Sequence, residues 1–492
     1  MRVRFGHGLG FYRRPPARAG PLECAAFRSV QPATRPVLDP TDPAARDAAP
    51  RRRTLRTLGA GVLACAGLGP GSARAAPGAG PAVPHAAAGP APPAAEPIRL
   101  ALIEGLSGPF ANAGEAVARN IRFAIERVNA RGGVRAGASR RPFELVRFDS
   151  KGQADEALAL LAAAVDRGAG FVLQGNGSAV AGALIDAVAR HNEREPRRRV
   201  LYLNYGAIDP TLTNERCSFW HFRFDASLDM RMAALADALA PDRSVRRVAL
   251  VNQDYAFGRQ FAQAARAALA QRRPDARIVL DLLHPLGRVK DFAPYAARLR
   301  EAGADTVMTG NWGNDLSLLV RAARDAGLDA SWYTFYGNAL GAPAAIGEAG
   351  AGRVRAVSEW VPGAQPASDA DPIWHAFRAS VPDARDQYFN MRHVVMIELL
   401  AASIEAAGAT DAEPVARALE GRRHRGAPYE ARMRAEDHQL LGPLCVSVMQ
   451  RVDAAGLTYD VEGSGYGFGT VRRIGPEAAG LPTTCRMARP PG

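Results

Sequence analysis

Lysine is almost missing from this chain of 492 residues, in which only Lys151 and Lys290 accompany 60 arginines. The net charge of +13 is concentrated in residues 1–97, which carry +8, so the rest of the chain carries only +5. No arginine-rich run with interleaved aromatic residues occurs, and we therefore expect no nucleic acid partner. Apolar runs are also short. The weakly apolar stretch 57–68 has 12 residues, too few for a membrane-spanning helix.

The remaining composition is that of a globular protein. Hydrophobic residues make up 47% of the chain, charged residues 23% and aromatic residues 7%. These proportions exclude collagen, a coiled coil and disorder throughout, and the length allows two or three domains with cores of their own.

Residues 1–97 have the composition of a leader followed by a linker. They hold 16 of the 36 prolines, a density that cannot support helices or sheets. Within them, three arginines at 51–53 precede the apolar stretch 57–68 and then small residues, which is the arrangement of an export signal cleaved near Ala75. The arginines are similar to a twin-arginine signal. In the alternative, Cys65 becomes a lipid-anchored N-terminus, and we expect a periplasmic location in both cases.

From Ile98 onward the sequence alternates between strand and helix patterns. Short apolar runs end at glycine, proline or polar residues, and each is followed by apolar residues at helical spacing. Two successive series of this kind predict an α/β protein with two doubly wound parallel-sheet lobes. The expected strands are 98–103, 143–148, 171–173, 200–203, 248–251, 278–280, 306–308 and 332–335, followed by strands at 444–449 and around Tyr459. The expected helices in the second half include 228–239, 261–269, 292–299, 316–326 and 394–406.

Export would place the cysteines of this body in an oxidising compartment. Cys445 lies in an apolar strand pattern and is expected to be a buried thiol. Cys217 and Cys485 lie in polar segments, and we predict a disulfide between them. No cysteine pair has CxxC spacing and no histidine joins them at metal-ligand spacing, so we expect neither a metal nor another cofactor.

The loops that follow the expected strands share a composition. In open α/β sheets, ligands bind at the carboxyl ends of the strands. Most of these loops combine small residues with an amide or hydroxyl group and an aromatic side chain, which suits a cleft for a small polar or aromatic molecule. Ser178 is also expected to cap the next helix. The candidate ligand-binding residues are Ser107, Phe110, Asn176, Ser178, Tyr205, Gly206, Ala207, Ile208, Tyr255, Phe257, Asn311, Trp312, Tyr336 and Asn338.

Catalytic patterns are missing from the same loops. The sequence contains no GxSxG, no HExxH, no P-loop and no GxGxxG at the first strand ends. No nucleophile or pair of carboxylates with separate roles can be picked out, so we name no catalytic residue and do not expect an enzyme.

Four loop sequences together resemble the leucine/isoleucine/valine-binding family of type I periplasmic solute-binding proteins, which serve ABC importers. They are GLSGPFANAG at 105–114, NYGAIDPTLT at 204–213, DYAFG at 254–258 and NWGND at 311–315. The resemblance implies two lobes joined by three crossover strands, with the ligand cleft between the lobes. The crossovers are expected near 221–224, 354–360 and 433–438. Lobe 1 would combine 98–222 with 358–435, lobe 2 would combine 223–357 with 436–480, and 481–492 would form a tail.

The same resemblance implies roles for individual residues. Ser178 and the turn at 206–208 would meet a ligand carboxylate, and Phe257 and Trp312 stand where lobe 2 of the family commonly has tyrosines. Ile208 replaces the usual threonine. The family's acidic residue for an α-ammonium group falls near Asn338, where this sequence has no acid. We therefore expect a carboxylate or amide ligand with aromatic or apolar bulk, while an α-amino acid stays possible.

The function that the resemblance implies is that of an exported receptor. It would bind a small molecule as a monomer and deliver it to an ABC permease in the inner membrane. The alternatives are a periplasmic ligand sensor for a signalling partner, because the fold does not fix the readout, and less favourably an α/β enzyme.

Overall fold

The first sheet of the computed structural model is parallel throughout. The structure describes residues 96–363, 371–452 and 456–491, so the expectations for Ala75, for Cys65 and for the rest of the leader lie outside the described residues. The sheet has the order β4 (Phe143–Asp149), β1 (Ile98–Glu104), β5 (Phe171–Gln174), β6 (Leu201–Asn204) and β7 (His221–Arg223). Its central strands are buried on both faces, as apolar runs in parallel sheets require.

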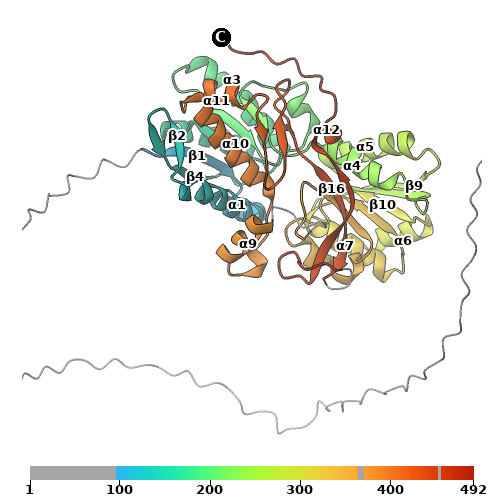
Figure 1. Ribbon diagram of the computed structural model, residues 1–492. Helices are drawn as coiled ribbons and strands as arrows, with labels where there is room; N and C mark the ends of the chain where they lie inside the picture. The colour runs from blue at the N-terminus through green and yellow to red at the C-terminus, as the bar shows by residue number, and fades with distance from the viewer. Residues whose placement is uncertain (1–95, 364–370, 453–455, 492) are drawn as a thin grey trace, which may run out of the picture. The chain divides into compact units, whose positions relative to one another are not determined.

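Helices cover this sheet, and α10 packs against both α1 and α11 (Figure 1). Together they enclose one apolar cluster, which includes Leu102, Ile121, Leu173 and Leu400. We call this sheet and its helices lobe 1. The helices are α1 (Ala111–Ala130), α2 (Ala154–Asp166), α3 (Ser178–Arg194), α10 (Met391–Ala407) and α11 (Ala412–Leu419), with the hairpin β2 (Val134–Ala136) and β3 (Ser139–Arg141) beside them.

The second sheet is mixed. Its order is β17 (Tyr466–Ile474), β16 (Leu444–Arg451), β12 (Val354–Ser358), β11 (Ser331–Thr334), β10 (Thr306–Thr309), β8 (Arg247–Gln253) and β9 (Arg277–His284). The strands from β12 to β9 are parallel, whereas β16 and β17 are antiparallel to their neighbours. The prediction of a strand around Tyr459 was wrong. Tyr459 lies in the connection before β17, which has glycines at 463 and 465 with positive φ.

Apolar clusters lie on both faces of the second sheet, because successive side chains of a strand point to opposite faces. Val248 and Leu250 face the cluster that includes α4 and α5, while Ala249 and Val251 face the cluster of α6, α7 and α8. We call this sheet and its helices lobe 2. Its helices are α4 (Leu228–Leu239), α5 (Ala256–Arg272), α6 (Ala293–Glu301), α7 (Gly313–Asp325), α8 (Ala342–Ile346) and α12 (Pro476–Ala479).

The chain crosses from one lobe to the other more than once. It leaves lobe 1 after β7 and enters lobe 2 at α4, and it returns after β12 through α9 (Asp371–Ser380) to α10. A small sheet of β13 (Arg423–His424), β14 (Ala431–Met433) and β15 (Leu440–Leu441) then leads back to β16. The residue boundaries that the sequence analysis gave for the two lobes stay a prediction.

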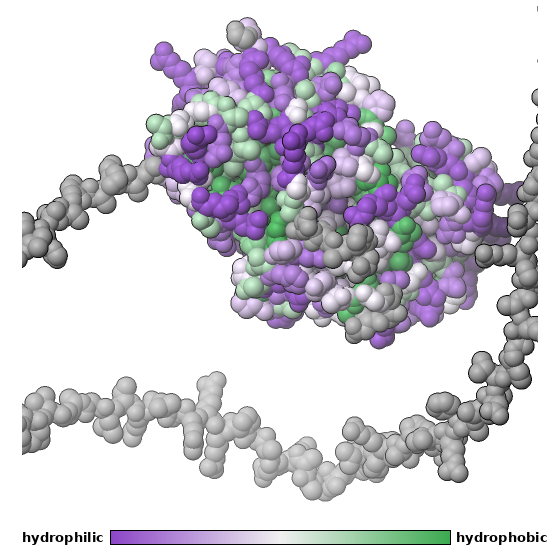
Figure 2. Space-filling model, in the orientation of Figure 1, coloured by the Kyte–Doolittle hydropathy of each residue, from purple (hydrophilic) through white to green (hydrophobic). Residues whose placement is uncertain are grey.

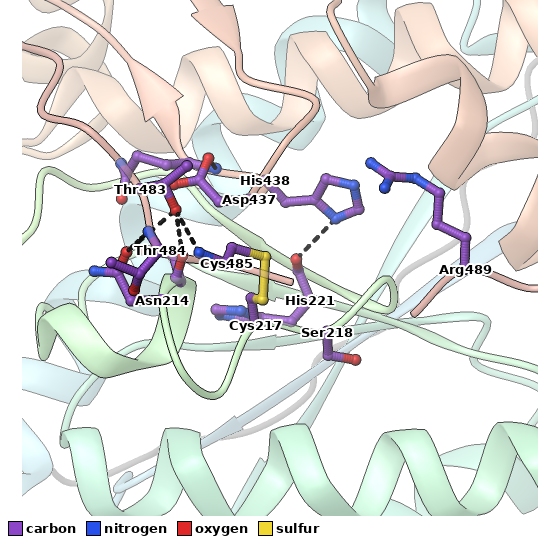
Figure 3. The surroundings of a disulfide bond; sticks show 12 residues. Asn214, Cys217, Ser218, His221, Asp437, His438, Thr483, Thr484, Cys485 and Arg489 are labelled. Atoms are coloured by element: carbon purple, nitrogen blue, oxygen red, sulfur yellow. Dashed lines mark hydrogen bonds between the residues drawn. A yellow bond between two sulfur atoms is a disulfide. The ribbon is translucent and has the colours of Figure 1, made fainter. Parts of the chain in front are cut away.

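The tail after α12 crosses back to lobe 1. Ala479 packs in a lobe 2 cluster, whereas Cys485 forms a disulfide with Cys217 in the loop before β7, with a Cα–Cα distance of 5.8 Å (Figure 3). This is the pairing expected from the sequence. Beside it, Asn214 Oδ1 accepts hydrogen bonds from the Thr483 hydroxyl at 3.1 Å and from the Thr484 backbone N–H at 2.9 Å. The remaining described cysteine, Cys445, is buried and free.

Hydrophilic residues cover most of the face shown in Figure 2, with apolar residues in small areas between them. Among the described residues, no single helix is long and apolar enough to cross a membrane, while α10 and α11, bent by 113°, pass the same test of length and composition as a pair.

Candidate ligand-binding site

A buried carboxylate, Glu104, ends β1 at the edge of the first sheet where parallel strands present their carboxyl ends. Its Oε1 accepts a hydrogen bond from the Gly105 N–H at 3.0 Å, and its Oε2 accepts from the Asn176 N–H at 3.1 Å and from the Tyr205 hydroxyl. Burial raises the pKa of Glu104, while these donors, Tyr205 foremost, oppose the rise. Glu104 could not be recognised from the sequence, because nothing in its local pattern shows that three loops converge on it.

Tyr205 fixes how closely two of these loops approach. A Cβ atom on Gly175 would lie 2.4 Å from the Tyr205 ring, so this position requires glycine. The ring of Tyr205 lies 5.1 Å from that of His393, whose Nε2 is buried without a hydrogen-bond partner in the described part of the chain. Burial, together with the nearby Arg392, lowers the pKa of His393 to about 3, so its imidazole is neutral.

In lobe 2 the predicted aromatic residues come together. The indole N–H of Trp312 donates a hydrogen bond of 2.9 Å to the Tyr255 hydroxyl. The ring of Phe257 lies 5.9 Å from the rings of both Tyr255 and Tyr336. Three strand ends, those of β8, β10 and β11, therefore contribute to one aromatic wall.

The loop after β5 differs from its predicted local structure. Ser178 was expected to cap α3, but it is the first helical residue and Gly177 occupies the N-cap position. Gly177 has a φ of 102°, a conformation that favours glycine, so the turn into the helix occurs one residue earlier. Ser178 and Asn176 are both half-buried, and Asn176 Nδ2 has no hydrogen-bond partner among the described residues.

The remaining predicted residues have varied surroundings. Ser107 is exposed, and the half-buried Phe110 packs over Gly152, where a Cβ atom would lie 2.6 Å from its ring. The buried Asn311 places its Nδ2 2.8 Å from His284 Nε2. Asn338 lies at the cavity described below.

Asn204, the last residue of β6, holds the turn at 206–208 in place. The backbone N–H groups of Gly206 and Ala207 donate hydrogen bonds of 3.1 and 2.8 Å to Asn204 Oδ1. Ile208 packs in a lobe 2 cluster, and its carbonyl accepts a hydrogen bond of 2.8 Å from the Leu228 N–H. The turn therefore contacts both lobes.

A cavity of about 50 Å³ lies between segments of the two lobes, and of its lining only Asn338 is among the candidate residues predicted from the sequence. Its walls include α9 and the segment before α10, which pack against the apolar cluster of lobe 1. Lobe 2 contributes Asn338 and the connection between β16 and β17, and the crossover after β12 completes the wall. The lining residues are Asn338, Ser358, Trp360, Val361, Pro362, Trp374, Gln387, Tyr388, Phe389, Asn390, Asp460, Val461, Glu462 and Phe468.

One carboxylate of this cavity has a raised pKa. Burial raises the pKa of Glu462 to about 7, and the backbone N–H of Gly341, which donates a hydrogen bond of 2.8 Å to its Oε2, opposes the rise only in part. Arg119 of α1 also lowers the pKa of Glu462, but Arg119 is paired at 2.9 Å with Asp386, whose charge acts in the opposite direction.

Four charged side chains connect the two lobes beside the crossovers; Asp225 and Arg231 are buried, and Arg392 and Glu359 are 11% exposed. Asp225, which follows β7, accepts hydrogen bonds from Arg231 of α4 at 2.5 Å and from Arg392 of α10. The Arg392 Nε also donates a hydrogen bond of 3.1 Å to Glu359, the residue after β12. Burial alone would raise the pKa of Glu359, but Arg392 and Arg231 hold it below its ordinary value. The two guanidinium groups and two carboxylates balance, so the cluster is neutral.

The described residues offer no group of three or more histidine, cysteine, aspartate or glutamate side chains that could hold a metal ion. The lining of the cavity carries aromatic, amide and carboxylate groups.

Comparison with known proteins agrees with this architecture. The family model for periplasmic binding proteins matches residues 97–457. The chain belongs to this family. The Leu/Ile/Val-binding protein homolog 4 of Brucella abortus is 35% identical over 260 residues, which are 52% of this chain and 60% of that protein. This chain thus spans about three fifths of the length of that relative.

Other members of the family align over more of their length. The leucine-, isoleucine-, valine-, threonine- and alanine-binding protein of Pseudomonas aeruginosa is 26% identical over 332 residues, which are 66% of this chain and 83% of that protein. The crystal structure of the protein of the same name from Brucella ovis, in a closed conformation, aligns with a TM-score of 0.72 at 27% identity. That alignment covers 80% of this chain and all of the Brucella ovis chain. The type I periplasmic binding protein fold expected from the sequence is confirmed.

Proposed function

We propose that the protein is an exported solute-binding receptor of an ABC importer, and that it captures a small molecule by closing its two lobes. Family membership supports this function, and so do the names of the relatives, which describe them as amino acid-binding proteins. The observation that carries the proposal is the cavity, because both lobes and a crossover segment contribute to its walls. A ligand held between the lobes favours the closed state by contacting both at once.

The sequence favoured a carboxylate or amide ligand over an ammonium group, because no acidic residue lies near Asn338 in the sequence. In the structure, however, Asp460 and Glu462 line the same cavity as Asn338. These carboxylates come from the connection between β16 and β17, more than a hundred residues later in the chain. The structure therefore does not favour a carboxylate ligand over an amine.

The proposed function is tested by ligand screening followed by a measurement of closure. Purified protein would be heated in the presence of single amino acids, amines, amides and aromatic acids, because a ligand that binds only the folded state raises the melting temperature. Any compound that stabilises the protein should also reduce its radius of gyration in small-angle X-ray scattering. Stabilisation without compaction would contradict capture by closure, and chemical turnover of the compound would contradict a receptor without catalysis.

A further inference from the structure

The walls of the cavity between the lobes combine aromatic rings with negative charge. Of its described lining residues, five are aromatic, two are carboxylates and none is arginine, lysine or histidine. The aromatic residues are Trp360, Trp374, Tyr388, Phe389 and Phe468. A carboxylate or phosphate ligand would find no basic side chain in this lining, so its negative charge would lose hydration without a cationic partner.

The carboxyl group of Glu462 forms no ion pair with a basic side chain among the described residues. Its Oε2 accepts the hydrogen bond from Gly341, while its Oε1 accepts none from the described residues. The charged groups near it from other elements are Arg119 of α1 and Asp386 before α10, which already pair with each other. On its own loop, Asp460 adds a second carboxylate, whose Oδ2 accepts a hydrogen bond of 2.9 Å from the Gly465 N–H.

The aromatic side chains add a second kind of attraction for cations. The face of an aromatic ring is electronegative and attracts ammonium groups, most strongly where water is excluded. Trp374 already has the guanidinium of Arg378 over its ring, 4.6 Å from the ring centroid. Trp360 and Tyr388 carry no such cation among the described residues. Burial raises the pKa of Tyr388, so its ring stays a neutral phenol.

We propose that this cavity holds the nitrogen end of an organic ammonium ligand, with Glu462 as its counter-charge and with Trp360 and Tyr388 as its aromatic walls. The inference rests on the proposed receptor function and specifies its ligand class. A volume of about 50 Å³ accommodates about four water-sized groups, enough for a substituted ammonium group.

Calorimetric titration with pairs of isosteric probes tests the proposal. The first pair is choline and 3,3-dimethylbutan-1-ol, which differ in the replacement of the charged nitrogen by carbon. The second pair is 3-methylbutylamine and 3-methylbutan-1-ol. We expect at least one cation to bind at least tenfold more tightly than its neutral partner, because only the cation gains the attraction of Glu462 and of the ring faces.

The variant Glu462→Gln should lose this preference by tenfold or more while keeping its melting temperature. The matched control is Glu477→Gln, which should leave the preference unchanged. Glu477 lies on α12, and its exposed carboxylate pairs with Arg432 of β14. The affinity of the wild-type protein for the cation should also rise as the pH increases through about 7, because Glu462 loses its proton over that range. In Glu462→Gln this pH dependence should disappear.

The outcomes separate the inference from the function on which it rests. Equal affinities for cation and isostere, or binding of 4-methylpentanoate with no binding of either cation, would overturn the ammonium ligand and leave the receptor function standing. A cation preference that survives in Glu462→Gln would overturn the role of Glu462. If no compound of the screen and none of these probes bound, both the ligand class and the receptor function would be overturned.

Discussion

The environment of Glu104 shows how a single buried carboxyl links three loops of lobe 1. Burial raises its pKa above the ordinary value, so this group stabilises the fold most at a pH below its unfolded pKa. The stabilisation declines as the pH rises through the folded pKa, because the charged form is costly to bury. The Tyr205 hydroxyl and the surrounding N–H groups limit that decline by donating hydrogen bonds to the charged form.

The first prediction concerns this hydroxyl. Tyr205→Phe should lower the free energy of unfolding by about 1.5 to 3 kcal/mol, the range for a hydrogen bond to a charged group. The loss should be larger at pH 8 than at pH 5, because the variant raises the pKa of Glu104 further. Urea unfolding across this pH range would measure it. The control is Tyr333→Phe, whose hydroxyl is 3.4 Å from Asp242 and should change stability less. A loss equal at both pH values would contradict the assigned role of Glu104.

At the scale of elements, the charges around Arg392 join the start of α10 to the segments that follow β7 and β12. Burial alone would lower the pKa of Arg392, but Asp225 and Glu359 raise it above its ordinary value. Each partner comes from a different passage between the lobes. The relative placement of these segments therefore depends on hydrogen bonds between charges that the surrounding protein shields from water.

Removing the shared guanidinium should have a large effect. Arg392→Met leaves Asp225 and Glu359 with less compensation, and we expect the free energy of unfolding to fall by about 3 to 5 kcal/mol. The matched control Arg385→Met breaks an exposed pair with Asp383 and should cause no measurable change. The double variant Asp225→Asn, Arg392→Met should recover part of the loss. If the double variant were as unstable as the sum of its single changes, the assigned pairing would be wrong.

Much of the element structure follows from local patterns. The helix expected at 228–239 has the same bounds in the structure, where Ser227 caps it by accepting a hydrogen bond from the Met230 N–H. The prediction that Ser178 caps α3 was wrong, because Gly177, which has a positive φ, occupies the N-cap position. The cavity was missed for a different reason. Trp360, Tyr388 and Glu462 lie in three connections far apart in sequence, and no local period shows that the fold brings them together.

At the scale of the whole molecule, the tail forms a connection between the lobes in addition to the backbone crossovers. Only a few residues separate Ala479 in a lobe 2 cluster from Cys485 on lobe 1. The guanidinium of Arg489 also donates hydrogen bonds of 2.8 Å to Glu420, after α11, and of 2.6 Å to the carbonyl of Ala435, in the segment expected to form the third crossover. The residues of the tail are not buried, so water can replace their polar contacts with the rest of the protein. The disulfide is the attachment that water cannot replace.

We predict that Cys217→Ser, Cys485→Ser lowers the free energy of unfolding by about 2 to 5 kcal/mol, because the bond joins positions 268 residues apart and restricts the unfolded chain. Loss of the disulfide should also accelerate backbone hydrogen exchange more in residues 481–491 than in β16. Wild-type protein treated with reductant should behave as the double variant does, which serves as the control. Unchanged exchange in the tail after reduction would show that its polar contacts suffice.

The position of this bond has a consequence for biosynthesis. Cys485 is translated 268 residues after Cys217, so the cystine cannot form on a product that stops before position 485. Formation of this bond therefore reports that translation has passed position 485 and that the segment after α12 has reached its place beside β7. A gel shift between alkylated reduced and unreduced material would thus count oxidised molecules that contain both cysteines and exclude those that stop short of position 485.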